Sequence, residues 1–110
     1  MMEPENLQLI GLELAVRWKD GVEDYLPMEF LRAASPSADN MGEPDIFGRM
    51  QGGDPQKHFP GVRVVNFVPV GRYGIRLIFS DGHQTGIFSF PYLRRLGEYI
   101  RSAGAHADDD

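Results

Sequence analysis

The sequence contains no cysteine, and this absence removes several kinds of chemistry at once. A chain without thiols has no disulfide framework, no thiolate nucleophile and no cysteine-based zinc or iron–sulfur site. No apolar run approaches the ~20 residues that a membrane-spanning helix needs. Residues 1–6 also lack the basic start and apolar stretch of a secretory signal. We therefore expect a cytoplasmic protein with no membrane partner.

The 110 residues that are present are 42% hydrophobic and 25% charged, which is the usual composition of one globular domain. The formal net charge of −5 is unevenly distributed. Residues 1–60 carry a balance of −6, residues 61–101 one of +4, and the C-terminal aspartates add −3. The acidic total argues against nucleic acid as a partner. The arginines of residues 61–101 either pair with the acidic first half or form an anion-binding face.

Alternating side chains and two Asp-Gly pairs predict a hairpin in each half of the chain. In residues 12–18, apolar side chains alternate with others, which is the period of a half-buried strand. Asp20-Gly21 and Asp81-Gly82 each separate two β-forming segments, and glycine there accepts the positive φ of a hairpin turn. The expected strands lie at residues 7–10, 12–18, 22–26, 62–68, 74–79 and 85–88.

A short helix is expected after each hairpin. Residues 28–34 follow Pro27, and residues 90–100 follow Ser89 as a helix N-cap, with Pro91 at the first helical position. The chain thus repeats a ββα-like unit. We predict an α+β fold in which the two units form one antiparallel sheet with short helices packed on it.

Proline and glycine accumulate between the two units, in residues 35–61, and predict a long central loop. We expect a single domain over residues 1–101 that includes this loop. Residues 102–110 are small and acidic, and we expect them to form a flexible tail.

The residue sets that catalysis needs are incomplete. Ser80, Asp81 and His83 stand almost side by side on one expected turn, whereas a triad needs groups that converge from different elements. Residues 48–53 have the glycine spacing of a phosphate-binding loop, but Asp54 stands where that loop needs lysine. We therefore expect no catalytic residues and no enzymatic activity.

Metal binding is an alternative, because oxygen and nitrogen ligands would meet if the central loop folded over the second hairpin. The candidate ligands are Asp39, Asn40, Asp54, His58, Asp81 and His83. None of them has the spacing of metal ligands on a regular element.

The chain resembles the gamma-butyrobetaine hydroxylase-like N-terminal domain family from about residue 9 to residue 97. The matching motifs are Trp18-Lys-Asp-Gly21, Leu31-Arg-Ala-Ala-Ser35-Pro-Ser37-Ala38, Pro69-Val-Gly71-Arg-Tyr73, Phe79-Ser-Asp-Gly-His83, Gly86-Ile-Phe-Ser-Phe90 and Leu93-Arg94. In the carnitine-biosynthesis dioxygenases, this domain precedes the catalytic domain that holds iron and 2-oxoglutarate. The resemblance therefore implies no hydroxylase activity here.

The resemblance also implies four zinc-ligand positions, three cysteines and one histidine. These positions fall on Ser35, Ser37, Asn40 and His83, so only the histidine is retained. Hydroxyl groups are poor zinc ligands at neutral pH, and we expect the family zinc to be lost and no cofactor to replace it. Iron or another metal stays an alternative. Related domains fused to ATPases with iron–sulfur clusters imply an accessory role in cluster metabolism.

We predict a small non-catalytic module that docks on an unidentified partner protein, with a link to iron or iron–sulfur metabolism. The alternatives are a metal-binding protein built on His83 and an anion-binding regulatory domain. Pairing of two chains through an exposed edge strand is a further expectation. The candidate binding surface comprises Arg32, Ser35, Ser37, Arg72, Tyr73, Asp81, Gly82, His83 and Arg94.

Overall fold

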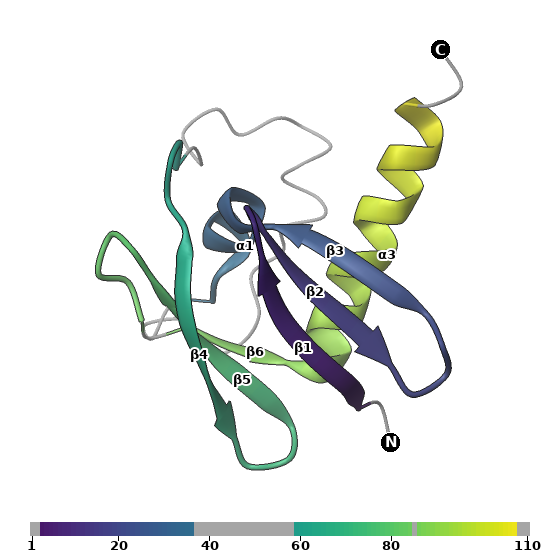
Figure 1. The fold of residues 1–110 in the computed structure, drawn as a ribbon, viewed down its shortest axis with the longest axis horizontal. Coiled ribbons are helices and arrows are strands. Elements are labelled where there is room, and N and C mark those ends of the chain that lie inside the picture. Colours follow the sequence, from purple (N-terminus) through teal and green to yellow (C-terminus); the bar gives the residue numbers. More distant parts are fainter. Residues whose placement is uncertain (1–2, 37–58, 85, 108–110) are drawn as a thin grey trace.

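The computed structural model describes residues 3–36, 59–84 and 86–107, and these form two successive units of three strands and one helix (Figure 1). The first unit contains β1 (Pro4–Ile10), β2 (Glu13–Trp18), β3 (Glu23–Pro27) and α1 (Met28–Ala34). The second contains β4 (Val64–Val70), β5 (Gly74–Phe79), β6 (Ile87–Ser89) and α3 (Phe90–Ala107). The predicted α+β class is confirmed.

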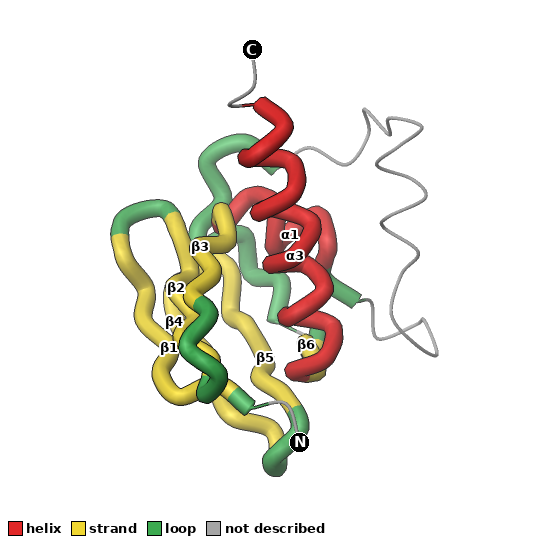
Figure 2. Tube along the Cα trace, turned by 90° about the vertical axis from the view of Figure 1, so that its right-hand side faces the viewer, coloured by secondary structure: helices red, strands yellow, loops and turns green. Residues whose placement is uncertain are grey.

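Each unit has its own antiparallel sheet, with strand orders β1-β2-β3 and β4-β5-β6. The single sheet that we expected is thus divided into two, because β1 pairs only with β2 and β4 only with β5 among the described strands. Both helices lie on the same side of the two sheets (Figure 2). Among the described residues, no helix covers the opposite faces of the sheets.

The two units repeat each other in detail. A register shift interrupts the first strand of both sheets, between Pro4 and Asn6 and again between Val64 and Asn66. The Asp-Gly turns also match, because Gly21 has a φ of 91° and Gly82 one of 92°. These shared irregularities confirm the repeat that the two Asp-Gly hairpins indicated.

The core forms where the inner faces of the sheets meet the helices. Strand residues alternate as the sequence predicts, with Leu14 and Leu77 fully buried and Arg17 and Arg76 exposed. The helices contribute Leu31 and other buried side chains that recur at helical spacing. The largest fully buried side chains are Trp18, Tyr92, Phe79, Phe88, Leu14, Leu26, Leu31, Ile75, Leu77, Leu93, Leu96 and Val16.

Several element ends differ from those expected. β4 continues through Pro69 to Val70, since a proline without an N–H is tolerated on an edge strand. Pro27 ends β3 and precedes α1 instead of occupying its first turn. α3 continues to Ala107 because alanine favours helix and no proline stops it. The predicted N-cap is confirmed, as Ser89 Oγ accepts the Tyr92 N–H at 3.2 Å.

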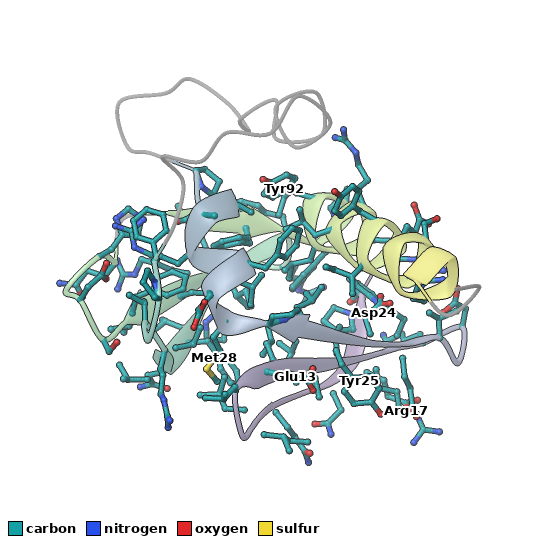
Figure 3. The ribbon with its side chains drawn as sticks, turned by 90° about the horizontal axis from the view of Figure 1, so that it is seen from above. Glu13, Arg17, Asp24, Tyr25, Met28 and Tyr92 are labelled. Carbon is teal, nitrogen blue, oxygen red and sulfur yellow. The ribbon has the colours of Figure 1, made fainter. Side chains whose placement is uncertain are left out.

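One buried acid was not singled out by the sequence. Asp24, on β3, is 1% exposed, and its carboxylate accepts hydrogen bonds from Trp18 Nε1 at 2.8 Å and Arg101 Nε at 2.6 Å. Figure 3 shows Asp24 on the helix side of β3 and Tyr25 on the opposite side. Asp24 thus connects both units through α3. Within the described part of the chain, no helix is long and apolar enough to cross a membrane.

Candidate functional site

Residues from both units meet where the end of α1 contacts the turn between β5 and β6. We call this cluster of Arg32, Ser35, Phe59, Asp81 and His83 the His83 corner. Ser35 Oγ lies 2.9 Å from His83 Nε2, although the two residues are 48 positions apart in the chain. Which of the two atoms donates depends on the imidazole tautomer. Two of the four positions that the resemblance assigns to zinc ligands, Ser35 and His83, are therefore in direct contact.

Arg32 and Asp81 form the second link across the His83 corner. Arg32 Nε donates to Asp81 Oδ2 at 2.9 Å, and the other carboxylate oxygen accepts the backbone N–H of His83 at 3.1 Å. The Arg32 guanidinium also lies over the ring of Phe59, 4.1 Å from its centroid. Phe79 lies on the core side, with its centroid 5.8 Å from the same guanidinium. Arg32 is thus fixed by one ion pair and two aromatic rings.

Burial and the neighbouring charges shift the pKa values of the two titratable groups on the turn. Burial raises the pKa of Asp81, but the His83 N–H and the Arg32 guanidinium outweigh it, and the pKa ends below the ordinary value. Burial lowers the pKa of His83, and Arg32 lowers it further, against the opposing effect of Asp81. The imidazole is consequently neutral at pH 7, able to donate one hydrogen bond and accept another.

We expect the lowered pKa of His83 to make stability depend on pH. An unfolded histidine takes up its proton near pH 6.5, before the folded one does, so the His83 contribution is complete above that pH. It is lost as the pH falls through the folded pKa. Urea unfolding at pH 7 and pH 5 should therefore show a larger loss of stability in the wild type than in His83→Gln. Equal losses in the two proteins would contradict this assignment.

The first unit holds an equivalent corner without a histidine. Arg94, from α3, binds both carboxylate oxygens of Asp20 at 2.9 and 3.2 Å and lies near the Trp18 ring. The main effect on the pKa of Asp20 is the hydrogen bond from Arg94, which lowers it. Val22 occupies the position that His83 has in the second unit. The Val22 carbonyl accepts the N–H of Trp18 at the end of β2, as the His83 carbonyl accepts that of Phe79 at the end of β5. Arg94, which we included in the candidate binding surface, therefore lies at this equivalent corner and not at the His83 corner.

The remaining predicted surface residues divide into three groups. Gly82 belongs to the exposed turn of the His83 corner. Arg72 and Tyr73 lie in the turn between β4 and β5, where Tyr73 is 56% exposed. This turn precedes β5, whereas the turn of the His83 corner follows it, so the two lie at opposite ends of that strand. Ser37 lies outside the described residues, as does Asn40.

The contact between Ser35 and His83 has the elements of a nucleophile and its base, but the third group of a triad is placed differently. Both oxygens of Asp81 are engaged, one by the His83 backbone and one by Arg32, so this carboxylate does not orient the imidazole. The absence of catalysis stays a prediction. These hydrogen bonds form a polar surface that links the end of α1 to the turn between β5 and β6.

The donors of the His83 corner do not fit the zinc site that the family resemblance implies. The hydroxyl of Ser35 is hydrogen-bonded directly to His83 Nε2, and a neutral hydroxyl is a poor zinc ligand. Within residues 3–36, 59–84 and 86–107, no three histidine or acidic side chains gather around one point. The other candidate ligands, Asp39, Asp54 and His58, lie outside the described residues.

The structure adds two features to the site that the sequence did not predict. Phe59 covers the Arg32 guanidinium, although it belongs to the stretch expected to be irregular. One arginine of each helix also pairs with the turn of the other unit, Arg32 with Asp81 and Arg94 with Asp20. The repeated Asp-Gly turn followed by Leu-Arg was visible in the sequence, but not the exchange between units.

Comparison with known proteins gives a consistent assignment. The family model described as gamma-butyrobetaine hydroxylase-like, N-terminal matches residues 7–94. A crystal structure from Acidithiobacillus ferrooxidans, described as a protein with unknown function in the DUF971 family, is 36% identical. That match covers 86% of this chain and 92% of the other, with a TM-score of 0.65.

Two solution NMR structures are also similar. One is 32% identical over 96% of this chain and 81% of the other, with a TM-score of 0.68. The second is 27% identical over 100% of this chain and 84% of the other, with a TM-score of 0.69. A search of the curated proteins found no match.

Proposed function

The chain belongs to the gamma-butyrobetaine hydroxylase-like N-terminal domain family, and from this premise we propose that it is a non-catalytic module that docks on a partner protein through the His83 corner. The observation that carries this proposal is the way Arg32 is held. Its Nε atom binds Asp81 and its face lies against Phe59, while its terminal nitrogens make no hydrogen bond with another described residue. Arginine and aromatic side chains dominate binding energy at protein interfaces.

The rigidity of the His83 corner supports the same proposal. Two links, Arg32 with Asp81 and Ser35 with His83, join the end of α1 to the second hairpin. A surface that is ordered before binding loses less conformational entropy when the partner docks. A fixed guanidinium fork also favours a carboxylate as its ligand. We therefore expect an acidic side chain of the partner at Arg32.

The proposal is tested by affinity capture from an extract of the native host, with the recovered proteins quantified by mass spectrometry. His83→Ala removes the imidazole from the corner and should reduce recovery of the specific partner at least about tenfold, which corresponds to about 1.4 kcal/mol. The fold should tolerate this change, since one half-exposed hydrogen bond contributes about 1 kcal/mol. The identity of the partner also tests the link to iron or iron–sulfur metabolism, which the family resemblance alone suggests.

Ser102→Ala, at an exposed position on α3, is the matched control and should recover the partner as the wild type does. Equal recovery by wild type and His83→Ala would remove the His83 corner from the interface. Circular dichroism melting of all three proteins separates loss of binding from loss of folding.

A further inference from the structure

The first strands of the two sheets, β1 and β4, are equivalent edge strands. Each pairs on one side only among the described strands, β1 with β2 and β4 with β5. The shared register shift aligns the two strands residue by residue. Counted from it, Leu7 corresponds to Phe67, Gln8 to Val68 and Leu9 to Pro69. Open strand edges pair readily with other strands unless something protects them.

The edge of β4 is protected at two successive positions. Pro69 has no N–H, and a proline inside a paired strand directs its nitrogen away from the neighbouring strand. Two residues earlier, the Phe67 N–H faces the same way, because backbone groups alternate between the two edges of a strand. That N–H is capped by Asn66 Oδ1 at 2.8 Å. The outer edge of β4 therefore offers no free donor at either position.

The edge of β1 lacks both protections. β1 and β2 are joined by Gly11 and Leu12 alone, so Ile10 and Glu13 close the hairpin as a hydrogen-bonded pair. By alternation, the backbone N–H and C=O groups of Leu7 and Leu9 point away from β2. No side chain of the described residues caps these two N–H groups. Residues 6–10 also contain neither proline nor charge.

We propose that β1 pairs in antiparallel fashion with β1 of a second copy of this chain, around a twofold axis through Gln8. This register places Leu7 opposite the partner's Leu9, so the outward backbone groups of both strands satisfy each other. It also places Asn6 opposite Ile10 and Gln8 opposite itself, so no like charges meet. The second copy is the occupant that this symmetry favours, because the uncharged segment is complementary to itself. The two β1-β2-β3 sheets then join into one continuous sheet.

This interface lies on β1 and shares no residue with the His83 corner, so the failure of one proposal would leave the other unaffected. The test is the mass in solution, measured by light scattering after size exclusion between about 5 and 200 µM, since dimers dissociate on dilution. The wild type should approach twice 12.4 kDa at the upper concentration. Leu9→Pro copies the protection of β4 and should give a monomer.

A second pair of variants, which places charges at the proposed twofold axis, tests the interface even if Leu9→Pro fails to fold. Gln8→Lys and Gln8→Glu each place like charges opposite one another and should be monomeric. Mixed in equal amounts, the two variants should form a dimer again. Val68→Lys is the matched control, at the equivalent position of β4, and should dimerise as the wild type does.

Three results would overturn the proposal. The first is a wild type that stays monomeric at every concentration. The second is a dimer that survives the Gln8 substitutions or is lost with Val68→Lys. The third is a mixture of the two charged variants that stays monomeric, because this would place the axis elsewhere.

Discussion

Asp24→Ala is expected to lower the free energy of unfolding by about 3 kcal/mol, because the substitution leaves a buried indole N–H without a partner and breaks a partly buried ion pair. Trp18 is 1% exposed, so water cannot reach its Nε1–H and take the place of the Asp24 carboxylate as hydrogen-bond acceptor. Arg101 is 43% exposed and can return to solvent, which limits the loss. Trp18 is the only tryptophan of the chain, so urea unfolding can be followed by its fluorescence and checked by circular dichroism.

Asp24→Asn separates the two contributions. The amide oxygen can still accept from Trp18 Nε1, while the charge that faces Arg101 is lost. We expect its cost to be about half that of Asp24→Ala. Ser102→Ala, exposed on the same helix, should change stability by less than about 0.5 kcal/mol. An Asp24→Ala protein as stable as this control would show that the buried network does not stabilise the fold.

The local patterns of the sequence were sufficient to predict the elements of the fold. Alternation in residues 12–18 and 74–79, together with the Asp-Gly turns, predicted the central hairpins, because side-chain period and turn chemistry are local properties. The division into two sheets was not predictable, since it depends on which strand edges meet in space. The extension of β4 through Pro69 was missed for the same reason, as proline ends a central strand but not an edge strand.

The candidate site was predictable in part. The family resemblance assigned both Ser35 and His83 to zinc-ligand positions, and in the structure Ser35 Oγ lies 2.9 Å from His83 Nε2. Periodicity alone could not reveal that Arg32 pairs with Asp81 across the two units, because ion pairs between distant segments leave no local pattern. Asp24 was missed because an aspartate in a short polar stretch ordinarily lies at the surface, and its burial depends on Trp18 and Arg101.

Gly97→Ala is the second substitution with a large expected effect, although alanine is the better helix former by about 1 kcal/mol. Gly97 lies on α3 against β3, and a Cβ atom at this position would overlap the Asp24 carboxylate. That carboxylate is the end of a short side chain, but its two hydrogen bonds hold it in place. Either α3 must move away from β3 or both bonds must break. We expect a net loss of about 2–4 kcal/mol in urea unfolding.

The double variant Asp24→Ala/Gly97→Ala tests this cause, because removing the carboxylate also removes the overlap. The double variant should be no less stable than Asp24→Ala alone, so the two single losses should fail to add. Simple additivity would instead show that the methyl group at position 97 meets something other than Asp24. The second unit offers a comparison, since a Cβ atom at Gly86 would overlap Ser35 Oγ. In both places, a glycine of the second unit makes room for a polar side chain of the first, and the two units can approach only because the glycine carries no side chain.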